Sequence, residues 1–492
     1  MGKFRLTTKG QLLVWLYARS IRAMRVTPMR LAVLSVALLA GLLGPGVTPA
    51  QTPAPETYSG SFWDRPRLTG DWGGFRDRAA KRGVTLDVDW LQTLQGVMSG
   101  GVSKNADYWG TFEYTLNVDT GKLGLWPGGF FTAYALSSYG SSDIKDSGAL
   151  VPVNTAGILP SLVVDDPATA LMQLTYTQFL APWFGIAVGK FNGLAADDNE
   201  FAHDFRTQFL NLGFSFNLAA ITAPLSAWGG SLIFVLGKEA LITAAVIDPN
   251  GTPLDNSLDH LFDDGVMVAS EARVAVKPFG LVGHQLLGFL WSNKERVQLL
   301  QDPGDTAALL LVNRFPRLAD PGPVLRRIIA LRFPDLATPP QPLKTRGETW
   351  TVYYNFDQYL WSPRSDPKKG LGVFFRFGVS DGKVNPVKYA YNVGLSGNGI
   401  VPGRPNDTFG IGWSRLELSD DLLPVLRRRF DIGLDREDAV ELYYNVAVVK
   451  SIGATLDLQV VNPALTKTAS GSGGVKNVDT AVVGGLRAFV RF

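Results

Sequence analysis

The sequence predicts an all-β fold: a transmembrane antiparallel β-barrel of about 16 strands, preceded by a short N-terminal helix. Three observations lead to this prediction. Many short segments alternate apolar and polar side chains with the period of two that β-strands have. The first fifty residues have the layout of a secretory signal. The chain also ends in an alternating strand whose last residue is Phe492.

Residues 1–50 are interpreted as a signal peptide that is removed on export. They contain seven Lys or Arg and no acid, then an apolar run from Leu31 to Gly44, then small residues up to Ala50. The basic part is longer than a signal needs, which suggests that translation starts at Met24 or Met29. A membrane anchor is less favoured, because the apolar run is short for a bilayer and ends in Gly-Pro-Gly.

Composition excludes several classes of protein. Removing the seven cations of the signal turns the formal net charge of +3 into −4, and no basic stripe remains, so we expect no nucleic-acid partner. The absence of Cys excludes disulfides, thiolate catalysis and thiolate metal sites. The charge-free stretch 207–237 is as long as a transmembrane helix, but Pro224 and Gly229-Gly230 interrupt it. We interpret it as a loop followed by one strand.

Residues 51–83 form the predicted N-terminal segment. Within it, "TGDWGGFRDRAAKRG" has the pattern of a short amphipathic helix with Trp72, Phe75 and Ala79 on one face and Gly83 as its C-terminal stop. Our hypothesis is that this helix packs into the periplasmic mouth of the barrel. The alternative is a helix that only leads into the first strand.

Residues 84–492 form the predicted barrel domain. The links between strands mostly alternate between short and long, as the periplasmic turns and outer loops of bacterial barrels do, and 140–169, 192–227, 296–347, 417–437 and 462–478 are long. The sixteen predicted strands lie near 84–95, 108–119, 128–139, 170–180, 183–191, 228–237, 240–248, 265–276, 285–295, 348–360, 371–381, 386–396, 406–416, 438–449, 452–461 and 479–492.

The alternation also assigns the two faces of each strand. In "ELYYNVAVV", Glu441, Tyr443 and Asn445 share one parity, whereas Leu442 and Tyr444 share the other. An Arg at the bilayer midplane costs roughly 2–4 kcal/mol, so the charged parity must face the lumen and the apolar parity the lipid. Glu441, Tyr443 and Asn445 are therefore expected to line water.

Aromatic residues at the turns support the membrane interpretation. Trp126, Trp183 and Trp361 all fall at predicted periplasmic turns, where an interfacial girdle is expected. A soluble β-sandwich would alternate too, but it would not need sixteen such strands, asymmetric links and a charge-rich inward face. A barrel of sixteen strands is wide enough to leave an aqueous channel.

Several motifs resemble one family across essentially the whole exported chain. "RLTGDWGGFRDRAAKRGVTLDVDWLQ", "NEFAHDF", "GHQLLGFLWSN", "YYNFDQYL" and "GRPNDTFGIG" occur in that order, followed by "ELYYNVAV", "LDLQVVNP" and "VVGGLR". They resemble the carbohydrate-selective porins of the OprB family. This resemblance implies a sixteen-strand porin for sugars such as glucose in the outer membrane of a Gram-negative bacterium. Segment 296–347 is longer and more basic than the resemblance leads us to expect. It is interpreted as an outer-loop insertion, a partial lid or a surface helix.

A channel for sugars needs hydrogen-bond donors and acceptors, which Arg and carboxylates supply, and aromatic faces for stacking. Binding must be weak, because a solute that is held tightly cannot leave. Any single lumen residue is more readily explained as a solvated wall residue than as a sugar contact. The predicted pore-lining and substrate-binding residues are Asp87, Asp89, Glu113, Asn117, Glu271, Arg273, Tyr353, Asn355, Asp357, Arg376, Glu441, Tyr443, Asn445 and Arg487.

The loop 192–227 opens with "LAADDNEFAHDFR", a cluster of charged side chains. If it folds inward, it narrows the pore. Calcium binding by its oxygens is disfavoured, because the spacing fits no EF-hand. We therefore expect no metal and no cofactor.

Other functions stay open at this stage. General diffusion of small solutes, a receptor and a barrel enzyme are alternatives, although the exported chain has only three His and no GxSxG motif. The expected partners are sugar solutes, outer-membrane lipid and the assembly machinery that reads a C-terminal Phe, here Phe492. Homo-oligomer formation is not decided by the sequence.

Overall fold

A computed structural model describes residues 57–142, 144–161, 166–237, 239–301, 326–327, 331, 342–422, 436–469 and 475–492. The chain divides into two units, Met1–Gly44 and Pro45–Phe492, and all described residues belong to the second. The first unit, and with it the predicted signal peptide, lies outside the described residues. None of the helices in the described ranges has the length and apolar character needed to span a bilayer.

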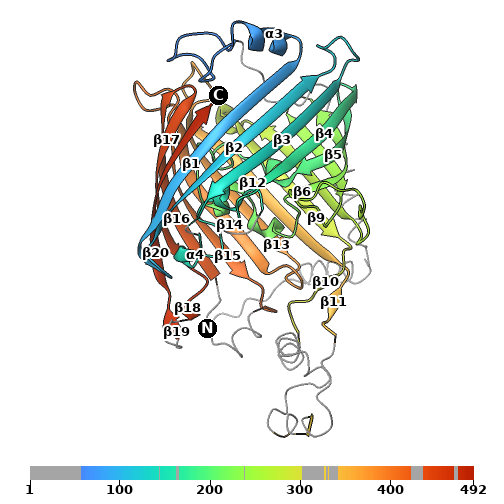
Figure 1. Cartoon of the computed structure of the whole chain (residues 1–492), viewed down its shortest axis with the longest axis vertical. Coiled ribbons are helices and arrows are strands. Elements are labelled where there is room, and N and C mark those ends of the chain that lie inside the picture. Colours follow the sequence, from blue (N-terminus) through green and yellow to red (C-terminus); the bar gives the residue numbers. More distant parts are fainter. Residues whose placement is uncertain are drawn as a thin grey trace, which may run out of the picture. The chain divides into compact units, whose positions relative to one another are not determined.

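Sixteen strands form one closed antiparallel barrel, which confirms the predicted fold and strand count (Figure 1). Each strand pairs with its neighbours in the chain, and β1 closes the barrel by pairing with β20. In barrel order the strands are β1 (Val84–Gly101), β2 (Ala106–Asp119), β3 (Gly129–Gly140), β4 (Thr169–Ala181), β5 (Phe184–Asn192), β6 (Ser226–Leu236), β7 (Ala240–Ile247), β8 (Met267–Val276), β9 (Gly283–Ser292), β12 (Thr349–Trp361), β13 (Gly370–Ser380), β14 (Val387–Asn398), β15 (Thr408–Leu418), β16 (Arg436–Val449), β17 (Ile452–Asn462) and β20 (Asp479–Arg491).

The two ends of the barrel differ as predicted. The short turns, such as that between β4 and β5, lie at the end that carries the C-terminus and helix α3 (Phe75–Lys81), and the long links lie at the opposite end (Figure 1). Two small sheets extend from that opposite end: β10 (Arg296–Val297) with β11 (Thr345–Arg346), and β18 (Lys467–Ala469) with β19 (Val475–Asn477). Most of segment 296–347 lies outside the described residues, so its interpretation stays a prediction.

The outer face is apolar and carries aromatic residues at the short-turn end. Leu442 is 51% exposed on the outside of β16, whereas Glu441 on the opposite parity is fully buried, so the predicted face assignment is confirmed. Trp126, Trp183 and Trp361 are about half exposed at the short-turn end, as an interfacial girdle requires.

Helix α3 is attached to the barrel through a cation and not through its aromatic face. Trp72 and Phe75 are 50% and 58% exposed, so this face of the helix does not make the contact with the barrel, and the hypothesis that the helix packs into the mouth stays a prediction. Arg76 is the buried residue: its guanidinium lies 4.1 Å from the ring of Tyr58 and donates to the Leu86 carbonyl and the Asp87 carboxylate. Gly83 follows the helix with φ of 85°, which supports the predicted stop.

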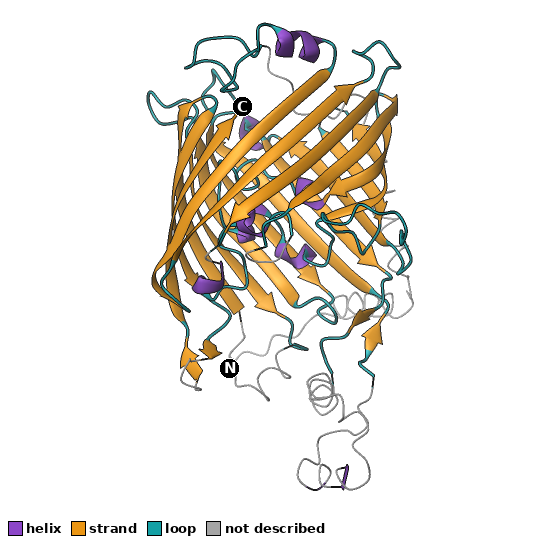
Figure 2. Ribbon diagram, viewed as in Figure 1, coloured by secondary structure: helices purple, strands orange, loops and turns teal. Residues whose placement is uncertain are grey.

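Two long links fold into the barrel and fill part of its interior (Figure 2). The β3–β4 link contains α4 (Ile144–Ser147) and η1 (Thr155–Ile158). The β5–β6 link contains η2 (Gly193–Ala195), α5 (Leu212–Ser215) and η3 (Leu218–Ala220). The expected loop plus one strand within 207–237 is confirmed, because β6 begins at Ser226. The remaining short helix, η4 (Pro278–Gly280), lies in the β8–β9 turn.

Candidate functional site

Buried ion pairs and hydrogen bonds hold the β5–β6 link, which we call the inner segment (residues 193–225), against strands β13 to β20. The Glu441 carboxylate of β16 accepts hydrogen bonds from the backbone N–H groups of Leu210 (2.6 Å) and Asn211 (3.0 Å). Arg376 of β13 donates to the Asp197 carboxylate (2.7 Å) and to the Phe214 carbonyl (2.6 Å). Since these groups are all buried, they act as structural anchors.

Two further charged residues, one on each side of the barrel closure, anchor the same segment. Arg487 of β20 donates to the carbonyls of Phe205 (2.7 Å) and Gln208 (2.6 Å). Glu113 of β2 accepts from the Arg206 guanidinium and from the Tyr134 hydroxyl, the latter at 2.7 Å. The inner segment is thus attached to strands on both sides of the β1–β20 pairing.

An aromatic cluster completes the attachment. Phe209 stacks on Phe214 with ring centroids 4.6 Å apart and meets Tyr443 edge-to-face at 4.7 Å. Strand β15 has glycine where the cluster packs against it. A Cβ at Gly412 would lie 2.6 Å from the Phe214 ring, and one at Gly410 would lie 2.8 Å from Tyr443. Glycine at these positions lets the aromatic rings approach the β15 backbone closely.

The β3–β4 link is held in the same manner. Glu437 of β16 accepts from the backbone N–H groups of Leu150 (2.7 Å) and Val151 (2.8 Å). The two links pack against the interior side of β14 to β20, where they share a hydrophobic cluster with these strands.

A cavity of about 1000 Å³ lies between the inner segment and the wall formed by β4 to β9 and β12. Its lining includes Leu241 near the short-turn end of β7 and Ile247 at the opposite end, so the cavity extends along the whole strand. Gln173, Thr175 and Thr177 of β4 contribute polar side chains. This cavity is the candidate channel.

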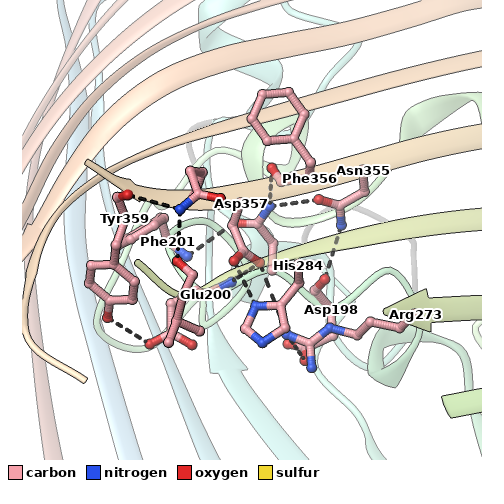
Figure 3. A network of polar contacts seen from close by, with 12 residues as sticks. Asp198, Glu200, Phe201, Arg273, His284, Asn355, Phe356, Asp357 and Tyr359 are labelled. Carbon is pink, nitrogen blue, oxygen red and sulfur yellow. Dashed lines mark hydrogen bonds and ion pairs between the residues drawn. The ribbon is translucent and has the colours of Figure 1, made fainter. Parts of the chain in front are cut away.

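A charged group borders the cavity where the inner segment meets β8, β9 and β12, and its members Asp198 and Arg273 belong to the cavity lining (Figure 3). Arg273 of β8 lies 3.3 Å from the Asp198 carboxylate and 4.0 Å from Asp357, and His284 of β9 contacts Asp357 at 2.7 Å. The Arg273 and Asp198 side chains are 27% and 50% exposed, so their charges can reach a passing solute. Glu200 completes the group by accepting from the Tyr359 hydroxyl at 3.0 Å.

Burial disfavours the charged forms of the titratable side chains in the inner segment. Burial raises the pKa of Glu200 above its usual range and lowers the pKa of His203. Burial also acts to raise the pKa of Asp204, but Arg206 and the Thr207 hydroxyl outweigh it and bring that pKa down to about 2. Near neutral pH the segment therefore presents a neutral His203 and a charged Asp204.

The fourteen predicted lumen residues separate into groups. Glu271, Arg273 and Tyr353 line the cavity, with Glu271 accepting from the Tyr353 hydroxyl at 2.6 Å. The prediction that Glu441, Tyr443 and Asn445 line water is wrong, because all three are at most 2% exposed. The group that binds or packs against the inner segment comprises Glu113, Asn355, Asp357, Arg376, Glu441, Tyr443 and Arg487.

The other four lie in the wall or at the mouth. Asp87 is paired with Arg67 and Arg76, Asp89 is opposite Arg491 in the β1–β20 register, Asn117 accepts from Thr132 and Asn445 donates to Thr455.

Some cavity residues were missed because they come from links or from uncharged strand positions. Lys145 and Asn217 belong to links, whose inward course no strand pattern reveals. Thr243 of β7 has lumen parity and could have been found from alternation alone. Among the residues that the structure describes, no group of three or more His, Asp or Glu has a metal-binding arrangement.

The carbohydrate-selective porin model of the OprB family matches residues 103–492, which is most of the chain. This chain belongs to the OprB family. It is therefore an outer-membrane channel of a Gram-negative bacterium and not an enzyme.

Individual relatives agree with the assignment. Porin B of Pseudomonas aeruginosa is 23% identical over 472 residues, covering 88% of this chain and 92% of that protein. The high pH structure of Pseudomonas putida OprB is similar with a TM-score of 0.69 and 22% identity, covering 88% of this chain and all of the other. The low pH structure of that protein gives a TM-score of 0.52 at 15% identity, covering 87% and 99%.

Proposed function

We propose that sugars such as glucose diffuse passively through the cavity along β4 to β9. The observation that carries the proposal is the extent of the cavity, whose lining reaches from Leu241 to Ile247 along all of β7. Passive diffusion needs a continuous water-accessible path and no moving part.

The pair of Arg273 and Asp198 is where selection takes place in this proposal. Arg273 offers guanidinium N–H donors and Asp198 offers carboxylate acceptors 3.3 Å apart, so neighbouring sugar hydroxyls can donate and accept at once. Tyr353 and Glu271 extend this hydrogen-bonding surface along the lining. Because both ions are partly hydrated, the binding stays weak enough for release.

The proposal also includes the partners of the barrel other than the transported solute. The apolar outer face is placed in contact with outer-membrane lipid, and Phe492 is proposed as the residue that the assembly machinery reads. The Phe492 backbone N–H donates to Val88 at 2.8 Å, so the last residue belongs to the barrel closure. Homo-oligomers would replace lipid contacts on one sector of the outer face.

The test is conductance of the purified exported protein in a planar bilayer, with glucose, sucrose and a charged solute of similar size titrated separately. We expect steady channels that glucose blocks saturably, with weaker block by the other two. Channels that no sugar affects would leave a general-diffusion porin, and the proposed substrate would be wrong.

A further inference from the structure

Part of the channel lining consists of aliphatic side chains that neither the membrane nor the protein core explains. We call these residues the apolar lane: Leu150 and Ile221 from the inward-folded links, and Ile233, Leu241 and Ile247 from β6 and β7. Leu150 and Ile221 are 47% and 49% exposed although they lie inside the barrel. Their exposed surface meets whatever fills the channel.

The β7 strand departs from the alternation that the rest of the barrel follows. Its outward residues, such as Ala244 and Val246, are apolar because they face lipid. Its lumen residues, Leu241, Thr243, Ala245 and Ile247, are mostly apolar as well. Lipid constrains only the outward parity. Tight packing is no explanation either, because the lane residues from β6 and β7 are only partly buried.

A purely polar solute gains nothing from such a surface. A sugar hydroxyl that loses water beside Ile221 or Leu241 finds no hydrogen-bond partner there, which is unfavourable. A solute with an apolar substituent gains by removing that substituent from water. The charged pair of Arg273 and Asp198 borders the same cavity and can engage the hydroxyls of the same solute.

We infer that the channel favours sugars that carry an apolar substituent, such as aryl or alkyl glycosides, over unsubstituted sugars of the same kind. This inference rests on the proposed function and names its substrate class more narrowly. The substituent contacts the apolar lane while the sugar ring contacts the charged pair.

The test compares glucose with phenyl β-glucoside as blockers of the purified protein in a planar bilayer. We expect phenyl β-glucoside to reach half-block at a concentration about tenfold lower than glucose, from the transfer of an aromatic ring out of water. Ile221→Thr and Leu241→Thr should each reduce this ratio to about threefold or less, because a hydroxyl replaces aliphatic surface. Thr243→Val should increase the ratio.

Leu254→Thr is the matched control. Leu254 is 47% exposed in the β7–β8 link and does not line the cavity, so this variant should keep the wild-type ratio. Ile221 is itself half exposed, so Ile221→Thr is expected to fold even if a strand variant does not.

The outcomes separate the two proposals. Equal half-blocking concentrations for the two solutes, or a ratio unchanged by both lane variants, would overturn the apolar lane and leave sugar transport standing. Block by phenyl β-glucoside without any block by glucose would support the lane and contradict transport of unsubstituted sugars. Channels that neither solute blocks would contradict both.

Discussion

Arg376 shows how a charged side chain that faces the lumen can be a structural anchor instead of a pore residue. Its parity on β13 places it inside the barrel, but it is only 1% exposed and is paired with the equally buried Asp197. Removing one partner of a buried pair leaves an uncompensated charge and costs roughly 3–5 kcal/mol. The barrel strands do not depend on this pair.

Replacing Arg376 should therefore release the inner segment without unfolding the barrel. We expect Arg376→Met to give larger and noisier single-channel conductance, while the barrel keeps its resistance to denaturation in a heat-modifiability gel. Lys369→Met, which removes a cation from an exposed pair with Asp366, is the control and should leave conductance unchanged. Wild-type conductance in Arg376→Met would show that the segment is held without this anchor.

Arg273 is the lumen cation that we expect to act on solutes. Arg273→Gln removes a charged hydrogen bond worth roughly 1.5–3 kcal/mol, so half-block by glucose should need roughly tenfold more sugar. Reversal-potential measurements should also show a shift towards cation preference, because Asp198 loses its counter-charge. The control is Lys277→Gln at the end of the same strand, where Lys277 is exposed. An unchanged selectivity and block would remove Arg273 from the conduction path.

The sequence predicts which side chains face the lumen, but it does not predict which of them border the cavity. Alternation correctly assigned Glu441, Arg376 and Arg273 to the lumen, since lipid excludes charge from the other face. It could not separate Arg273, which borders the cavity, from Arg376, which is covered by Phe214 and Asp197. That distinction depends on where a separate segment packs.

At the scale of elements, the inner segment is built from short turns that begin with Asn. The side chains of Asn192, Asn211 and Asn217 each accept a hydrogen bond from the backbone N–H two residues later, and each opens a helix of three or four residues. This repeated cap gives the segment local order, and the charged anchors then fix it to the wall. The Asn residues are visible in the sequence, but their role is not, because helices this short have no periodicity.

Acid should loosen this segment through Asp204. Its pKa falls to about 2 in the folded protein, so its ionised form contributes stability that is present above its ordinary pKa near 4 and is lost as the pH falls towards 2. The carboxylate is about one-third exposed, so we estimate the contribution at about 1 kcal/mol.

Single-channel noise against pH measures this effect. Wild type should be steady from pH 7 to about 4 and flicker below that, whereas Asp204→Ala should flicker already at pH 7. The matched control is Asp255→Ala, which removes a carboxylate from the outer β7–β8 link. Identical pH profiles for wild type and Asp204→Ala would contradict the assignment.

For the whole molecule, the outer face predicts how the barrel sits in a bilayer. Trp361 lies half exposed at the short-turn end and should be quenched by lipids brominated near the headgroup, whereas Trp109 is 2% exposed in the lumen and should not be. Trp361→Phe should therefore lower the quenchable fraction of fluorescence, and Trp109→Phe should raise it. Equal changes for the two variants would contradict this placement.

The complete strand order was predictable because the bilayer imposes one simple rule on every strand. Each strand must be apolar outward, so period-two alternation marks most of the sixteen strands, whereas β7 is apolar on both faces and is delimited by the turn residues Gly237 and Asp248 around it. The interior follows no such rule. Glu441 meets Leu210, and Arg487 meets Phe205, through contacts between distant parts of the chain that alternation does not encode.

The pairing of β1 with β20 has a consequence for the order of events during assembly. Asp89 lies opposite Arg491, so the first strand to be synthesised must wait for the last before its free edge is covered. Contacts between such distant positions form slowly. Until they form, the unfinished sheet offers two open edges to other chains, and its protection must come from outside the molecule. A chain that lacks β20 would leave β1 and β17 without their shared neighbour and would be expected to aggregate rather than insert.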